Sequence, residues 1–236
     1  MNHTIPSEVY LAFLDRTIPI HWEYHAILMT LAWFVLVPIG VVAVRFFKAK
    51  PQPYGINKIG IGSLHPKLLC WTIHYFALYG AIALSLLGLG IALLVSGGFS
   101  GTMHSVWGIA AVAFGCLQIV STWFRGTHGG RYVPGSNPDD PATWHGDHFD
   151  MTPRRRWFEA YHKTTGYFAL VLALGAVTSG LMQYWMPSIA IALGLILPGL
   201  LLTFIVLEGK GFRHDTYHSV YGTHPSLPYN RARNKD

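Results

Sequence analysis

Four histidines occupy matching places in the sequence, each near the start of a long apolar run. They are His25, His74, His104 and His162, and the runs that follow them are almost free of charged residues. Imidazole is the commonest metal ligand in proteins, because the neutral ring offers one nitrogen lone pair while the other nitrogen keeps its proton. Four such residues at corresponding ends of apolar segments therefore predict paired metal sites.

The apolar runs themselves predict an all-α integral membrane protein. Of the 236 residues, 51% are hydrophobic and only 12% are charged, which is too little polar surface for a soluble domain of this length. A helix of about 20 apolar residues is long enough to cross a bilayer. Five transmembrane helices are expected, at about residues 25–47, 69–95, 104–124, 157–183 and 188–207.

These spans define the expected domain organisation. An external N-terminal segment at 1–24, without the features of a cleaved signal peptide, precedes a membrane domain at 25–207. The first four spans are expected to form an up-down bundle. A cytoplasmic loop at 126–153 separates its two helical hairpins, and a cytoplasmic tail follows at 208–236. Thr152 and Pro153 predict a capped helix start, one turn before the fourth apolar run.

The distribution of positive charge predicts the orientation. Of the 17 Lys and Arg residues, only Arg16 precedes the first span, and the others lie in the first and third loops, the adjoining helix ends and the tail. Cytoplasmic loops carry the excess of Lys and Arg, so the N-terminus is expected outside and the C-terminus in the cytoplasm. If the protein is prokaryotic, the plasma or inner membrane is its expected location. The dispersed charge gives no indication of nucleic-acid binding.

With that orientation, the histidines pair by membrane face. His25 and His104 lie at the outer face, and His74 and His162 lie at the inner face. Diagonal helices of a four-helix bundle face each other across its core, and two imidazoles there suit the axial positions of a b-type haem. Two such haems are therefore expected, about 20 Å apart along the membrane normal by the helical rise.

Two glycines support a planar ligand in these gaps. Gly108 follows His104 by four residues, and Gly166 follows His162 by four residues. Residues i and i+4 lie on the same helix face, so each glycine is expected to leave room for the macrocycle beside the ligand. The two cysteines, Cys70 and Cys116, form no CxxCH motif that would attach a haem covalently.

The chain resembles the cytochrome b561 family, the transmembrane type with two haems. The resemblance covers roughly residues 21–185, with no attached extracellular domain, and rests on the four histidines and their surroundings. These are HAILMTLAWFVLVPIGVVAVRFFK from His25, His74 itself, MHSVWG from Met103 and RRWFEAYHKTTG from Arg155.

The resemblance implies that electrons pass from a cytoplasmic reductant such as ascorbate to an outer acceptor such as monodehydroascorbate or a ferric complex. It also implies basic residues at the reductant site, for which Arg45, Lys67 and Arg156 stand in comparable places. Each of the three is equally explained as a positive-inside anchor or a haem propionate partner. Membrane lipid is the expected environment, quinone or a redox protein is an equally open outer partner, and a homodimer is compatible with the sequence.

Two alternatives use the same residues differently. A haem b subunit of a larger dehydrogenase, which exchanges electrons with quinone, would have the same ligands. A membrane non-haem di-iron oxygenase would use closely spaced histidines, and such pairs occur at 21 and 25, at 145 and 148, and at 214 and 218. These pairs are expected on opposite faces of the membrane, which argues against one di-iron centre. The sequence HGDHFD at 145–150 offers a further candidate loop site for a metal ion.

Overall fold

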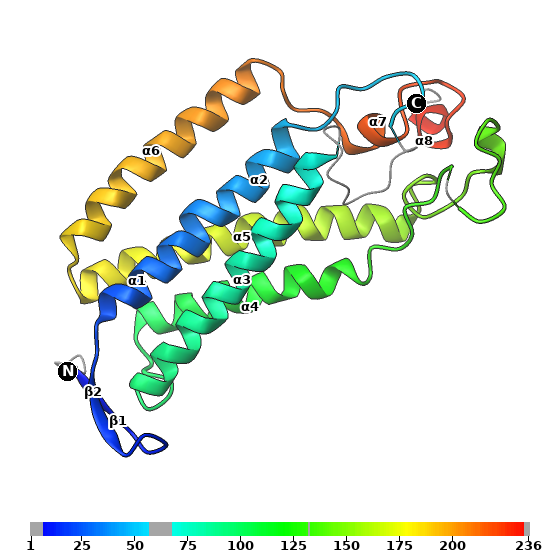
Figure 1. Ribbon diagram of the computed structural model, residues 1–236. Coiled ribbons are helices and arrows are strands. Elements are labelled where there is room, and N and C mark those ends of the chain that lie inside the picture. Colours follow the sequence, from blue (N-terminus) through cyan, green and yellow to red (C-terminus); the bar gives the residue numbers. More distant parts are fainter. Residues whose placement is uncertain (1–6, 57–67, 132, 234–236) are drawn as a thin grey trace.

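A computed structural model describes residues 7–56, 68–131 and 133–233 of the chain. The expected five apolar spans are helices (Figure 1), all of them long and apolar enough to cross a membrane. The first span is composed of α1 (Trp22–Thr30), a π-helical stretch η1 (Leu31–Leu36) and α2 (Val37–Phe46). The others are α3 (Leu69–Val95), α4 (Met103–Thr122), α5 (Pro153–Gln183) and α6 (Pro187–Gly209). The predicted all-α membrane fold is confirmed.

The helix ends follow local capping chemistry. Thr152 accepts a hydrogen bond from the backbone N–H of Arg155, and Pro153 is the first residue of α5, as the sequence predicts. Helix α5 therefore begins four residues before the expected span at 157–183, because the capped turn is polar and lies outside the apolar run. Thr102 caps α4 in the same way, by accepting from the N–H of Ser105.

The first span is not a uniform α-helix. Pro38 lies inside it and has no N–H, so the carbonyl one turn earlier loses its hydrogen-bond partner. The wider π-helical turn at Leu31–Leu36 directly precedes this position. Such turns are common at functional sites, and this one lies between His25 and Gly40, which belong to the two histidine sites described below.

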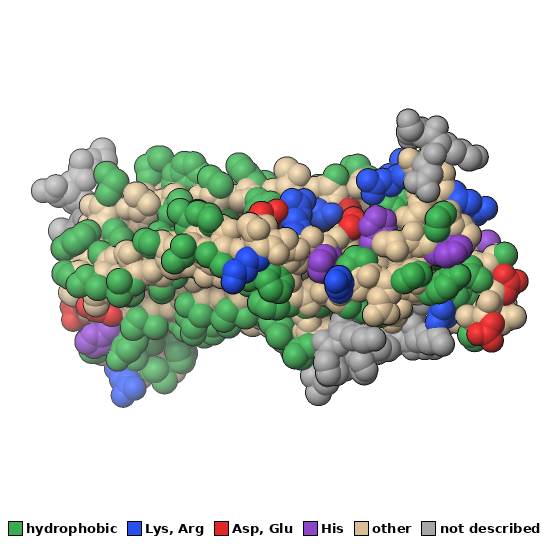
Figure 2. Space-filling view, turned by 90° about the horizontal axis from the view of Figure 1, so that it is seen from above, with side chains coloured by type: hydrophobic (Ala, Val, Ile, Leu, Met, Phe, Trp, Pro, Cys, Tyr) green, Lys and Arg blue, Asp and Glu red, His purple; other side chains and the backbone are tan. Residues whose placement is uncertain are grey.

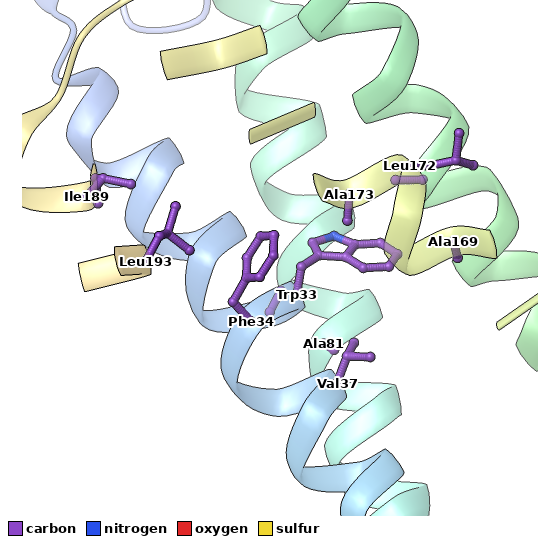
Figure 3. Close-up of a cluster of buried hydrophobic side chains, with 11 residues drawn as sticks. Trp33, Phe34, Val37, Ala81, Ala169, Leu172, Ala173, Ile189 and Leu193 are labelled. Atoms are coloured by element: carbon purple, nitrogen blue, oxygen red, sulfur yellow. The ribbon is translucent and has the colours of Figure 1, made fainter. Parts of the chain in front are cut away.

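The spans pack as two pairs of neighbouring helices. The first span lies along α3, α4 lies along α5, and α6 lies against the first span. Between them is a core of small and aromatic side chains (Figure 3), in which the indole of Trp33 extends toward Ala173 of α5. Alanines at 81, 111 and 169 belong to the same core and let the helices approach closely.

The outer surface of the spans is apolar. Large hydrophobic side chains of α6 are exposed, among them Ile191, Leu195, Leu201 and Leu202. Figure 2 shows hydrophobic side chains spread along the bundle, whereas Lys and Arg gather toward one end. An apolar surface of this extent matches a lipid environment.

The two ends of the bundle carry different structures. At one end, β1 (Glu8–Leu11) and β2 (Arg16–Pro19) form an antiparallel hairpin before α1 (Figure 1). At the other end, the segments 47–56, 126–131, 133–152 and 210–233 fold together, and we call this structure the cap. It includes a 3₁₀ turn at Pro141–Thr143 and the short helices α7 (Thr216–Val220) and α8 (Pro228–Arg233). The tail is thus ordered against the loops, which composition alone leaves undecided.

Candidate haem sites

The structure brings the four histidines together in the two pairs expected from the sequence. At the hairpin end, the ring centroids of His25 on α1 and His104 on α4 are 6.0 Å apart, with an interplanar angle of 83°. At the cap end, those of His74 on α3 and His162 on α5 are 6.4 Å apart, with an angle of 70°. All four side chains are half-buried inside the bundle.

Hydrogen bonds fix the proton position on three of the rings. Nδ1 of His25 lies 3.1 Å from the carbonyl oxygen of Gly88, and Nδ1 of His74 lies 3.0 Å from that of Gly40. Nδ1 of His104 lies 2.8 Å from the carbonyl oxygen of Ala176. A carbonyl oxygen only accepts, so Nδ1 donates and carries the proton. Nε2 is left with a free lone pair, which is the tautomer of a metal-binding histidine.

The donor set and its spacing fit a bis-histidine haem. Imidazole–metal bonds are about 2.0–2.1 Å long, so two axial rings on one iron have their centres about 6 Å apart. Both observed centroid distances agree with this value. At Gly108, one turn after His104, an added side-chain carbon would meet no other atom within 4 Å, so this glycine faces open space. At Gly166, it would lie 3.6 Å from Gln118 of α4, so this glycine faces a polar side chain.

Three further glycines contact the histidines, and their spacing in the sequence does not reveal this. Gly40 and Gly88 supply carbonyl oxygens to His74 and His25 on neighbouring helices. Gly180 on α5 lies so close to His104 that a side-chain carbon there would be 2.8 Å from its Nδ1. Each of these glycines acts across a helix pair, so its role follows from helix packing and not from its distance to a histidine in the sequence.

The three candidate substrate residues differ in their surroundings. Arg45 donates to Glu208 of α6 at 2.9 Å and to the hydroxyl of Tyr167 at 3.0 Å, which places it in a contact between three spans. Arg156 is exposed at the start of α5. Lys67 lies outside the described residues.

The cap-end site has a buried cation that the sequence reasoning missed. Arg155 is only 5% exposed, and its Nη1 has no hydrogen-bond partner within the described parts of the chain. Its Nε donates to Glu159 at 3.1 Å, and Lys163 donates to the same carboxylate at 3.1 Å. Arg155 precedes His162 by seven residues, two helical turns, so helical periodicity selects Arg155 instead of Arg156 as the residue on the ligand face.

An aromatic ring connects Arg155 to His162. Phe158 stacks on His162 with ring centroids 5.3 Å apart, and the guanidinium of Arg155 lies 5.3 Å from the centre of the Phe158 ring. The charge of Arg155 is therefore held beside the cap-end pair by packing as well as by its ion pair.

The cap holds two further buried histidines, His128 and His148, whose Nδ1 atoms are 3.4 Å apart. Burial, with the nearby guanidinium groups of Arg125 and Arg155, lowers the pKa of His128 to about 4. Burial and Arg155 likewise hold the pKa of His148 well below its usual value. Both rings are therefore neutral at physiological pH.

The candidate loop site at 145–150 is organised by hydrogen bonds. Asp147 accepts from the N–H of Thr127 at 2.9 Å and from the hydroxyl of Thr152 at 3.0 Å. Asp150 accepts from the N–H of Gly146 at 3.1 Å. Across the described ranges, no group of three His, Cys, Asp or Glu side chains is arranged to hold a metal ion.

Comparison with known proteins gives two relatives from Arabidopsis thaliana. A cytochrome b561 and DOMON domain-containing protein is 29% identical over 170 residues, which are 71% of this chain and 29% of the relative. A cytochrome b561, DM13 and DOMON domain-containing protein is 27% identical over 159 residues, 66% of this chain and 14% of the relative. The chain thus spans less than a third of the length of either relative.

No family model matches the chain, and no solved structure matches it significantly. The alignments with the two relatives cover 71% and 66% of this chain. This share agrees with the extent of the resemblance seen in the sequence. The chain is therefore homologous to cytochrome b561 domain-containing proteins, which supports its place in the cytochrome b561 family.

Proposed function

We propose that this protein transfers electrons across the membrane through two non-covalently bound b-type haems. His25 and His104 would hold the haem at the hairpin end, and His74 and His162 would hold the haem at the cap end. The pairing of the rings carries this proposal, because both pairs have the spacing of axial ligands and three of the rings have Nδ1 protonated. When bound, a bis-histidine haem supplies an iron that changes between ferric and ferrous states without an open coordination position.

The chain's own residues orient and insulate these sites. Backbone carbonyls accept hydrogen bonds from Nδ1 of His25, His74 and His104, which holds these three rings in place and fixes their tautomer. The apolar core around Trp33 lies between the two layers and excludes water. The buried guanidinium of Arg155 offers its free Nη1 to an anionic group at the cap end, and a haem propionate has the matching charge.

We place the cap in the cytoplasm and the hairpin outside, in line with the distribution of Lys and Arg. Electrons then enter at the cap end from an anionic reductant of the ascorbate type and leave at the hairpin end. The cations near the entry point, with Arg156 exposed and Lys67 nearby in the sequence, would attract such a reductant. The outer acceptor is a ferric complex, monodehydroascorbate, a quinone or a redox protein.

The haem-to-protein ratio of the purified chain, with a reduced-minus-oxidised spectrum, tests the proposal. Two haems per chain with b-type spectra are expected, and a ratio near zero or iron without porphyrin would contradict the proposal. Replacing His104 should remove only the hairpin-end haem, and replacing His162 should remove only the cap-end haem. If the loss of His104 also removed the haem bound by His74, the assignment of the pairs would be wrong.

The same purification separates an independent reductase from a subunit of a larger dehydrogenase. A chain that is reduced by ascorbate on its own supports the independent reductase. Co-purification with a stable partner that carries flavin or iron–sulfur centres supports the subunit.

A further inference from the structure

His162 differs from the other three ligands in the partner of its Nδ1. His25 on α1 donates to the carbonyl of Gly88 on α3, and His74 on α3 donates to the carbonyl of Gly40 on α2. His104 on α4 donates to the carbonyl of Ala176 on α5, the helix that packs along α4. His162 on α5 should by this pattern have its partner on α4. Its Nδ1 lies 2.9 Å from one end of the side-chain amide of Gln118, which is on α4.

The amide of Gln118 has two orientations with different consequences. In one, its Nε2 donates to the hydroxyl of Thr165, which itself donates to the carbonyl of Tyr161 at 2.7 Å. Its oxygen then faces Nδ1 of His162 and accepts a hydrogen bond from its N–H. This orientation also brings the amide oxygen close to the backbone carbonyl of His162, so the two oxygens repel each other.

In the opposite orientation, Nε2 donates to the backbone carbonyl of His162, and the amide oxygen accepts from the N–H of Gly166. The backbone of α5 is then better paired, but Nδ1 of His162 has to accept a hydrogen bond. The imidazole proton consequently sits on Nε2, where it blocks coordination. The two amide orientations thus correspond to a ring that binds iron and a ring that does not.

We propose that Gln118 is the positioning residue of the cap-end haem site, and that its side-chain oxygen accepts a hydrogen bond from the Nδ1–H of His162. This inference rests on the proposed haem function. A side chain at this place makes the basicity of His162 adjustable by one substitution, because an acceptor of different charge changes how strongly the imidazole donates to iron. The backbone carbonyls at the other three ligands do not allow such a change.

Two variants of Gln118 test the proposal in the full-length, haem-loaded protein. Gln118→Glu has nearly the same shape and offers a charged acceptor, whereas Gln118→Leu offers none. The reduction potential of each haem is measured by spectroelectrochemistry, and each ferric haem is followed by its low-spin EPR signal.

In Gln118→Glu, the equilibrium between ferric and ferrous iron in the cap-end haem should shift toward ferric iron by at least tenfold. Its reduction potential should therefore fall by at least about 59 mV, the value for a tenfold change in a one-electron couple. In Gln118→Leu it should shift toward ferrous iron, or that haem should be lost. The hairpin-end haem should keep its potential in both variants. Thr165→Val is the matched control, since it removes the hydroxyl beside Gln118 and leaves the acceptor, so the cap-end potential should move less than in either Gln118 variant.

Three results would overturn the inference. They are an unchanged cap-end potential in Gln118→Glu, a loss of the cap-end haem in this same variant, and an equal shift of both haems. If the wild-type chain binds no haem at all, the proposed function itself fails. Two haems in the wild type with potentials insensitive to Gln118 would instead refute this inference alone.

Discussion

At the scale of single residues, the basic side chains of the cap end differ in how their charge is balanced. Arg45 and Arg155 each contact a glutamate, Glu208 and Glu159, within ion-pair distance. Lys48 donates to the neutral hydroxyl of Thr216 at 3.0 Å. Because the side chain is half-buried there, desolvation lowers the pKa of Lys48 to about 8, although Asp215 acts in the opposite direction. Its charge is thus sensitive to pH just above neutrality.

This pKa predicts a pH-dependent reduction rate at the cap end. Above about pH 8, Lys48 loses its proton, so an anionic reductant meets one cation fewer. Reduction by ascorbate should therefore slow severalfold between about pH 7 and about pH 9. Stopped-flow absorbance of the haem bands measures this rate.

Two substitutions at this position provide the controls. Lys48→Arg keeps its charge throughout the range and should show a flat profile, whereas Lys48→Met should be slow at every pH. Because the lowered pKa makes the protonated lysine unfavourable in the folded state, stability should rise with pH from about 8 toward 10.5 in the wild type and not in Lys48→Met. A wild-type rate profile that matches the profile of Lys48→Arg would contradict a role for this charge.

At the scale of helices, the close approach between α4 and α5 depends on Gly180. A side-chain carbon at this position would lie 2.8 Å from Nδ1 of His104, which already bonds to the carbonyl of Ala176. To relieve this contact, the ring would have to shift relative to α5, which also carries its hydrogen-bond partner Ala176. Gly180→Ala should therefore displace His104 and weaken or remove the haem proposed at the hairpin end, while the haem proposed at the cap end remains.

The measurement is the haem-to-protein ratio, together with the EPR signal of each haem. Gly194→Ala on α6 is the matched control, because a side-chain carbon there meets nothing within 4 Å. Its only expected effect is a higher helix propensity at this position, which stabilises the folded protein by about 0.5–1 kcal/mol. Two haems with wild-type spectra in Gly180→Ala would show that this approach between the helices does not constrain the ligand.

The sequence alone predicts the extent of the helices but not the contacts between them. Long apolar runs predict the five spans to within a few residues, because the length and hydropathy of a membrane helix are properties of its own segment. The π-helical turn before Pro38, the carbonyl of Gly88 and the amide of Gln118 are not predicted, because they depend on how two helices are placed against each other. Arg155 is an intermediate case, since the helical period selects it once His162 is taken as the reference.

At the scale of the whole molecule, the bundle and the cap are stabilised in different environments. The bundle exposes apolar side chains and is suited to lipid, whereas the cap is a small polar structure with its own core. That core contains Trp144, Phe149 and Tyr221, which come from the loop after α4 and from the tail. Backbone hydrogen bonds from Ile56 to Val220 and from Thr223 to Gln52 add the loop after α2.

The neutral histidines inside the cap predict that it opens in acid while the bundle stays folded. The pKa of His128 is lowered to about 4 and that of His148 lies well below 6.5, whereas both groups titrate near 6.5 in an unfolded chain. Between pH 6.5 and about 4, the unfolded cap therefore binds more protons than the folded cap, and the stability of the cap falls as the pH falls. Buried neighbours such as Arg155 make protonation in the folded state still less favourable.

Hydrogen exchange followed by mass spectrometry measures this opening segment by segment, after correction for the intrinsic rate at each pH. Peptides from 126–150 and 212–233 should lose protection between pH 6.5 and about 4, while peptides from α3 and α5 keep it. His148→Phe places an apolar ring among the aromatic neighbours of His148 and removes one of the two titrating groups, so the cap should persist to lower pH. His145→Phe, at an exposed position of the same loop, should leave the profile as in the wild type. Equal protection of the cap at pH 6.5 and pH 4.5, or simultaneous loss in the cap and the spans, would mean that these histidines do not control the opening.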